Sequence, residues 1–128
     1  MRITNSTRNT ELCRNAVVAR TFWTRLVGLI GRRSLPKGHG LVITPCRSVH
    51  TMFMRFPIDV IYVDRSRRVV KTVSALKPYR ASLGGASAES AIELPAGTVG
   101  ATTTAVGDAL TVDENGEDAE PGVRITRA

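Results

Sequence analysis

The chain has 128 residues, 42% of them hydrophobic and 23% charged, which suits one globular domain with one core and is too little for two domains of ordinary size. No segment approaches the roughly 20 apolar residues of a membrane-spanning helix, and residues 1–6 are not followed by the apolar stretch of a secretory signal. We therefore expect a cytoplasmic protein without a membrane span. Its net charge of +7 is an excess that favours polyanionic partners.

The charge is unevenly distributed along the chain. Residues 1–80 contain 16 of the 18 basic residues and three acids, a net charge of +13, whereas residues 81–128 carry −6. The acids gather between Asp113 and Glu120. A solvated surface with a frayed acidic end explains this pattern as simply as a polyanion site does.

The first part of the sequence predicts short strands and one helix. Two strands are expected, at residues 1–4 and 12–18. Apolar residues then recur at helical spacing and predict a helix over residues 21–30. Thr21 is placed to cap this helix, and Gly31 to end it.

From residue 40 onwards the pattern becomes strand-like. Residues 58–63 are rich in β-branched side chains and apolar on both faces, as in a central strand, and with residues 69–76 they predict a β-hairpin. A long loop is expected over residues 78–86, followed by a short helix over residues 98–106 that Thr98 caps and Gly107 ends. Further short strands are expected at residues 40–44, 90–94 and 110–112.

These elements predict a mostly-β domain, either a small β-barrel or a sandwich, with one or two short flanking helices. Strands and helices do not alternate, which argues against a doubly wound α/β fold. We place the single domain at residues 1–112 and expect the acidic segment 113–128 to be disordered. Cys13 and Cys46 could form one disulfide, but free thiols are expected in a reducing cytosol.

Three blocks of sequence resemble one family of small bacterial and archaeal domains. They are residues 20–32, residues 46–64, which carry the stronger likeness, and residues 93–97 followed by 107–108. In order and spacing they resemble the DUF192 family, also called UPF0127. The matched motif positions are Gly28, Leu29, Met54, Pro57, Asp59, Asp64, Glu93, Pro95, Gly97, Gly107 and Asp108.

The resemblance implies a compact β-rich fold with a short flanking helix, and it implies no activity. Some relatives are exported and some occur with secretion or pilus systems, so a connection with such cell-envelope systems is one expectation. Cys46 and His50 resemble only one subgroup's version of the central block. The family therefore directs attention to this block without assigning chemistry to it.

The sharpest cluster of candidate residues begins at Cys46. If residues 48–54 are extended, His50, Met52 and Met54 share one face, and together with a nearby thiol they would suit a soft ion such as Cu(I). Alternating methionines on a strand are more often core residues, and no closed zinc spacing is present. We therefore expect neither a metal nor a cofactor.

Asp59 stands between apolar neighbours in the expected central strand, where an unpaired carboxylate is costly. By composition its nearest candidate partners are Arg47, Arg55 and His50. Either Asp59 has a structural role, in a salt bridge or bound to the backbone, or it forms the polar floor of a ligand pocket. Glu93 raises the same question, and the two acids could form a pocket if the strands bring them together.

We accordingly expect a non-enzymatic binding or accessory module, and a monomer, with a small polar or anionic ligand or a protein partner. The ligand would lie on the surface built by residues 50–59, with residues 80–88 as its rim. Arginines there would recognise an anionic or hydroxyl-rich group through charge-assisted hydrogen bonds. The expected ligand-binding residues are Arg47, His50, Met54, Arg55, Asp59 and Glu93.

Two alternatives remain open. A small hydrolase or transferase would use Cys46 as nucleophile, His50 as base and Asp59 as the acid that orients the base. Nucleic-acid binding would use the basic region 1–80, but the six aromatic residues offer few stacking surfaces and no nucleic-acid-binding motif is present. Residues 31–40 are basic and rich in glycine, yet they lack the lysine-serine ending of a phosphate loop.

Overall fold

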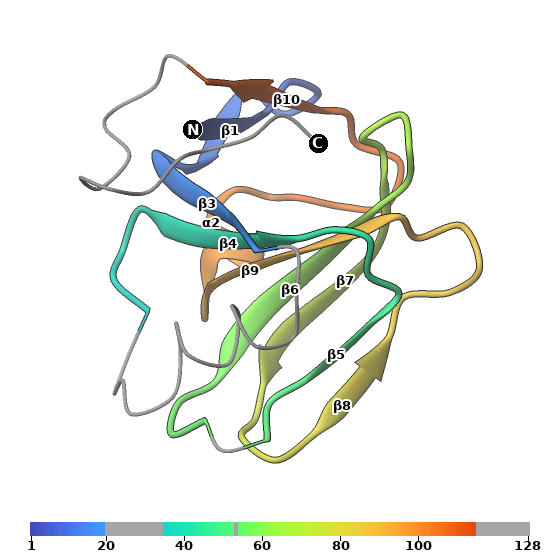
Figure 1. Cartoon of the computed structure of the whole chain (residues 1–128). Coiled ribbons are helices and arrows are strands. Elements are labelled where there is room, and N and C mark those ends of the chain that lie inside the picture. Colours follow the sequence, from blue (N-terminus) through green and yellow to red (C-terminus); the bar gives the residue numbers. More distant parts are fainter. Residues whose placement is uncertain (20–34, 53, 115–128) are drawn as a thin grey trace.

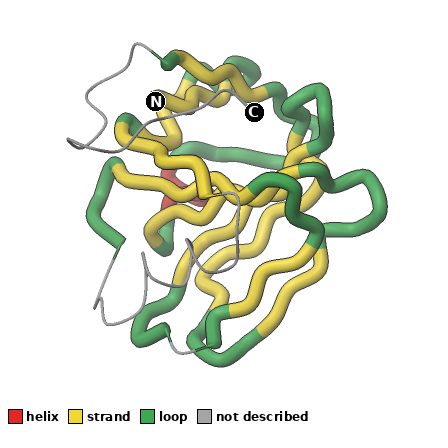
Figure 2. The backbone as a smooth tube through the Cα atoms, in the orientation of Figure 1, coloured by secondary structure: helices red, strands yellow, loops and turns green. Residues whose placement is uncertain are grey.

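The computed structural model describes residues 1–19, 35–52 and 54–114. Ten strands and one short helix make up this part of the chain (Figures 1 and 2). The strands are β1 (Arg2–Asn5), β2 (Thr10–Cys13), β3 (Asn15–Ala19), β4 (His39–Ile43), β5 (Ser48–His50), β6 (Ile58–Val63), β7 (Val69–Leu76), β8 (Ala81–Leu83), β9 (Ser90–Pro95) and β10 (Leu110–Asp113), and the helix is α2 (Thr98–Ala101). The helix predicted over residues 21–30 lies outside the described residues.

The strands form three sheets. The largest has the order β3-β4-β9-β6-β7, and only its β3–β4 pair is parallel. A smaller sheet, β10-β1-β2, covers one side of it, and a two-stranded ribbon, β5-β8, packs on the other side (Figure 1). The predicted mostly-β, sandwich-like fold is thereby confirmed, and the described strands do not close into a barrel.

The five-stranded sheet separates two hydrophobic cores. All six residues of β6, an interior strand between β9 and β7, are buried, as the β-branched pattern predicted. Ile61 and its partner Ile92 face the core beneath the sheet β10-β1-β2, whereas Val60 and Tyr62 face the core beneath the ribbon. Cys13 belongs to the first core and Cys46 packs against the second, and both are free thiols.

Two seams join the five-stranded sheet to the sheet β10-β1-β2. At the first, the nitrogen of Met1 donates to the carbonyl of Ala16 (3.1 Å) and the Ala16 amide donates back (2.8 Å). At the second, the Leu110 amide donates to the carbonyl of Arg67 (2.9 Å), next to a β-bridge between Arg68 and Ala109. These contacts hold the two layers at two separate places.

The ribbon β5-β8 corrects the prediction of a loop over residues 78–86. Its strands have only three residues each, too few for a period-two pattern to be visible in the sequence. The Tyr62 hydroxyl donates to the carbonyl of Ser82 (3.0 Å), and Gly84 lies so close to the ring that a Cβ there would stand 2.3 Å from Cδ1 of Tyr62. The buried Tyr62 is therefore one of the contacts that hold the ribbon on the sheet, together with Lys71, whose Nζ donates to the carbonyl of Leu83 (2.6 Å).

The helix predicted over residues 98–106 is much shorter, because α2 ends at Ala101. Thr98 is not its N-cap, since its hydroxyl donates to the carbonyl of Pro95 (2.7 Å); the capping position is Gly97, in the left-handed region with φ 98°. Thr103 leaves the helical conformation with φ 54°. The threonine run thus stops the helix well before Gly107. No helix in the described segments has the length and apolar character to cross a membrane.

Candidate functional site

Asp59 is fully buried, and backbone amides occupy both of its carboxylate oxygens. Oδ1 accepts from the amide of Ala75 (2.8 Å), and Oδ2 accepts from the amides of Gly97 (3.1 Å) and Val99 (2.8 Å). The carboxylate thus caps α2 from a neighbouring strand and holds Ala75 in its left-handed conformation, φ 51°. Of the roles considered for Asp59, the structure shows the one in which its carboxylate binds backbone amides.

Glu93 is fully buried too, but on the other face of the sheet. In the β6–β9 register Asp59 stands opposite Leu94, while Glu93 stands opposite Val60. Directly opposed residues share a face and successive residues alternate, so the two acids point to opposite sides. The condition for a shared pocket is therefore not met, because the strands separate Asp59 from Glu93.

The shared face considered for His50, Met52 and Met54 required an extended segment over residues 48–54, and the structure does not show one. β5 ends at His50, and a turn follows in which the Met54 amide donates to the carbonyl of Thr51 (3.2 Å). Met52 is 40% exposed, whereas Met54 is 2% exposed and belongs to the core beneath the ribbon. Within the described ranges, no three His, Cys, Asp or Glu side chains gather where they could hold a metal ion.

The residues proposed for nucleophilic catalysis do not form a triad. Cys46 is half-buried and its thiol donates to the carbonyl of Ser48 (2.8 Å), while Nδ1 of His50 accepts from the Met52 amide (3.4 Å). Asp59 cannot orient His50, because its two oxygens are bonded to backbone amides in the interior.

The two arginines expected to bind a ligand are both exposed. Arg55 belongs to the turn before β6, and Arg47 lies between β4 and β5, where its carbonyl accepts from the Gly84 amide (2.7 Å). Arg47 also lines a shallow hollow that it shares with Arg65 and Glu89. The expected site residues are therefore distributed over the interior, the ribbon and the surface.

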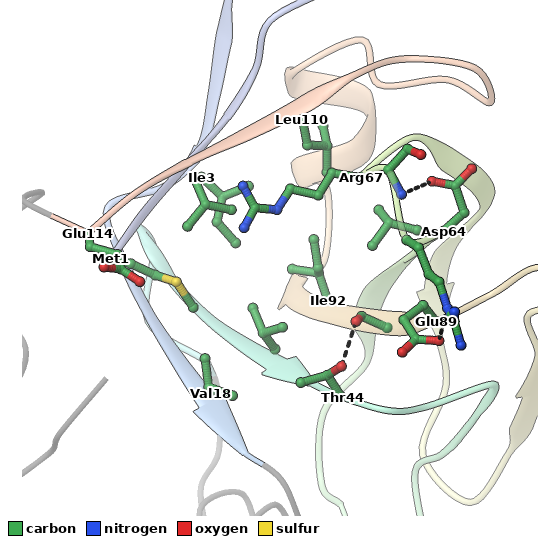
Figure 3. A pocket seen from close by; sticks show the side chains of 16 residues that line it. Met1, Ile3, Val18, Thr44, Asp64, Arg67, Glu89, Ile92, Leu110 and Glu114 are labelled. Carbon is green, nitrogen blue, oxygen red and sulfur yellow. Dashed lines mark hydrogen bonds and ion pairs between the residues drawn. The ribbon is translucent and has the colours of Figure 1, made fainter. Parts of the chain in front are cut away.

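A cavity that the sequence did not indicate lies between the five-stranded sheet and the sheet β10-β1-β2 (Figure 3). Its volume is about 480 Å³, within the range of roughly 300–1,000 Å³ that is common for small-molecule sites. Half of its lining is apolar and half is polar or charged. The lining residues are Met1, Ile3, Val18, Val42, Val63, Ile92, Leu110 and Val112, and Thr44, Asp64, Arg65, Ser66, Arg67, Glu89, Ser90 and Glu114.

The strand register explains the apolar walls. Val18 pairs with Val42, and Val42 pairs with Ile92, so these three side chains form one row across β3, β4 and β9. On the opposite layer Ile3 pairs with Val112 and faces this row. The valines of both layers are only partly buried, because the cavity leaves apolar surface uncovered in the middle of a sandwich.

The polar part of the lining forms the mouth. The Ser90 hydroxyl, at the start of β9, donates to the hydroxyl of Thr44, which follows β4 (2.9 Å). On the rim, Arg65 and Glu89 form an ion pair (3.5 Å), and the Arg67 side chain extends over the opening toward Ile3 (Figure 3). The β6–β7 turn contributes Asp64, Arg65 and Arg67, whereas Glu89 and Glu114 adjoin the ends of β9 and β10.

Sequence reasoning missed this cavity because its residues come from six separated strands and one turn. The available signal was indirect: Val18 and Val42 lie in short apolar strands, but nothing in the sequence shows which layer would cover them. The cavity can be located only when the strand register and the contacts between the two layers are known.

These features define a class of protein: a small β-sandwich domain with a cavity between its two layers that has apolar walls and a polar mouth. The chain belongs to the DUF192 family, whose model, described as an uncharacterized ACR, matches residues 3–112. A UPF0127 protein of Pyrococcus furiosus is 32% identical over 111 residues, which cover 83% of this chain and 93% of that relative. A UPF0127 protein of Pyrococcus horikoshii is 34% identical over 100 residues, covering 74% and 84%. The resemblance seen in the sequence is confirmed.

Two crystal structures share the fold at 19% sequence identity. A protein of unknown function from Novosphingobium aromaticivorans superposes with a TM-score of 0.70, over 87% of this chain and 82% of its own. A Sinorhizobium meliloti protein, described provisionally as a transcription regulator, superposes with a TM-score of 0.72, over 86% and 89%. At this identity both likenesses show the fold alone. No description among these relatives names a reaction or a ligand.

Proposed function

We propose that this protein is a non-enzymatic binding module that holds a small, largely apolar organic molecule in the cavity between its two layers. The observation that carries the proposal is the partial burial of Val18, Val42 and Val112, which face the cavity from both layers. Uncovered apolar surface inside a domain forgoes contacts that a ligand would supply.

The chemistry of the lining supports binding rather than catalysis. The sixteen described residues around the cavity include no histidine and no cysteine, which are the usual general base and thiol nucleophile. The polar groups instead form a hydroxyl pair, Thr44 with Ser90, and charged residues at the rim. Such an arrangement, a few polar groups at one end of an apolar pocket, orients a ligand in many binding sites.

A neutral fluorescent probe, N-phenyl-1-naphthylamine, tests this proposal directly. We expect saturable binding of one molecule per chain, with the fluorescence increase of a probe that enters an apolar site. Val42→Phe would fill the cavity from its floor and is expected to weaken probe binding by at least about tenfold. Val106→Phe, which adds a similar side chain at a position 65% exposed and outside the lining, is the matched control.

Probe binding by the two variants distinguishes the cavity site from other binding. Probe binding that is lost in Val42→Phe and kept in Val106→Phe supports the cavity site. Probe binding that is absent, or that both variants retain, would overturn the proposal. Thermal unfolding of both variants checks that each is folded at the temperature of the titration.

A further inference from the structure

We infer that the ligand carries a single carboxylate at one end of its apolar body and that Arg67 binds this group at the mouth of the cavity. This inference rests on the proposed function and names the class of ligand. It is carried by the fixed backbone of Arg67, by the position of its side chain over the opening, and by the pairing of the other charges around it.

The backbone of Arg67 is held on both sides. Its amide donates to the carbonyl of Asp64 (3.0 Å), and its own carbonyl accepts from the amide of Leu110 (2.9 Å). The Asp64 carboxylate fixes the same turn by accepting from the amides of Ser66 (2.8 Å) and Arg68 (3.0 Å). Arg67 adopts φ 62°, a conformation that is uncommon for a residue with a side chain. The turn therefore fixes the main-chain position from which the Arg67 side chain extends.

From this position the Arg67 side chain extends over the cavity rather than away from it (Figure 3). Its guanidinium has no ion-pair or hydrogen-bond partner anywhere in residues 1–19, 35–52 and 54–114. An arginine without a partner in these segments, placed at the polar end of an apolar pocket, offers the planar pair of donors that matches a carboxylate.

The remaining charges at the mouth limit the charge of the ligand. Arg65 is paired with Glu89, the Asp64 carboxylate is bonded to two amides, and Glu114 also has a partner. Among the residues that the structure describes, the lining thus offers one unpaired cation, next to three acidic side chains. A group with two negative charges would meet that acidic rim, whereas a single carboxylate would be matched by Arg67 alone.

Displacement of N-phenyl-1-naphthylamine by matched ligands tests the inference. We expect octanoate to displace the probe at about one-tenth of the concentration that octanamide requires, since a charge-assisted contact is worth about a tenfold change in affinity. Octyl phosphate, whose head group carries more negative charge, is expected to be weaker than octanoate. Added salt should reduce the advantage of octanoate, because Arg67 is exposed.

Two variants test whether Arg67 causes the preference for octanoate over octanamide. Arg67→Gln should lose the preference for octanoate over octanamide, with both ligands compared in the same variant. Arg68→Gln is the matched control, because Arg68 belongs to the same turn but donates to the carbonyl of Gly107 (3.0 Å) and does not line the cavity. It should keep the preference.

The results distinguish this inference from the proposed function. Equal affinity for octanoate and octanamide, a preference that Arg67→Gln retains, or a stronger affinity for octyl phosphate would overturn the carboxylate inference while probe binding still supports the cavity. Absence of probe binding would overturn the cavity itself. Tighter binding of octanoate that disappears only in Arg67→Gln supports both.

Discussion

Asp59 caps the helix α2 although it lies far from this helix in the sequence. Capping rules based on neighbouring residues would not identify it. α2 has no side-chain cap of its own, and the amides of Gly97 and Val99 are bonded by a carboxylate from β6. A third amide, that of Ala75, uses the other oxygen. The residue that looked like a candidate catalytic acid is thus a connector between the sheet, the helix and β7.

Substitution of Asp59 by asparagine tests this role. The asparagine side chain would keep the shape but would turn a donor group toward a backbone donor, so we expect the free energy of unfolding to fall by about 1–3 kcal/mol. Denaturant unfolding measures the change. Asp113→Asn, at an exposed position at the end of β10, should stay within about 0.5 kcal/mol. Equal effects of the two substitutions would contradict the capping role.

Asp108 is a second acid held by hydrogen-bond donors. Hydrogen bonds from Asn5 (2.9 Å) and Arg8 (3.0 Å), joined by one from the Ala105 amide (2.9 Å), lower the pKa of this carboxyl from 3.8 to about 2. A lowered pKa in the folded state means that the unfolded chain binds the proton more tightly. The contribution of Asp108 is therefore fully present above about pH 4 and is lost as the pH falls toward 2.

We expect this pH dependence to disappear when the carboxylate is removed. The chain should lose stability between pH 4 and pH 2, and Asp108→Asn should show a smaller loss over the same interval. Unfolding in denaturant at several pH values measures both slopes. If the two slopes are the same, groups other than Asp108 govern acid unfolding.

Cys13 is expected to be chemically inert in the folded chain. Burial raises the pKa of its thiol to about 12, so the reactive thiolate is scarce at neutral pH. We expect an alkylating reagent at about pH 8, near the pKa of an ordinary thiol, to label Cys13 only after denaturation, which peptide mass spectrometry detects. Labelling of Cys13 in the native protein at the rate of an exposed thiol would show that the core around β2 opens readily.

At the scale of the elements, the ribbon β5-β8 depends on its contact with Tyr62. The ring lies against Gly84, and the hydroxyl is bonded to the Ser82 carbonyl in a buried position. Burial also raises the pKa of this tyrosine. Tyr62 thus attaches the ribbon both by packing and by a hydrogen bond.

Gly84→Ala should detach the ribbon from this contact. The new Cβ would lie 2.3 Å from a ring atom, so either the ring or the ribbon must move, and we expect a loss of about 1–3 kcal/mol in unfolding free energy. Gly100→Ala is the matched comparison, because nothing lies within 4 Å of its added Cβ and alanine favours the helix. Thermal unfolding of the two variants should move in opposite directions.

The elements also show what sequence patterns can and cannot predict. The β6–β7 hairpin was predictable because β6 is a run of β-branched residues followed by a polar turn. The ribbon was not, because three-residue strands carry no detectable period, and α2 was overestimated because the hydroxyl of Thr102 bonds the carbonyl of Thr98 (2.7 Å) at the end of the helix.

At the scale of the whole molecule, the sheet order decides which residues can meet. Asp59 and Glu93 lie on neighbouring strands and still face different cores, a relation fixed by a single step in register. The cavity arises in the same way, since its walls come from β1 and β10 on one side and from β3, β4 and β9 on the other. A site of this kind depends on which sheets pack against each other, and a single sequence does not show this.

The cap that Asp59 provides has a consequence for amide hydrogen exchange. A helix of four residues would ordinarily open and close freely, and its amides would exchange quickly. Opening α2, however, would leave Oδ2 of a fully buried carboxylate without its two donors, which is costly. We expect the Val99 amide to exchange as slowly as that of Ile61 in β6, through global unfolding. Fast exchange at Val99 would show that α2 opens independently of the sheet.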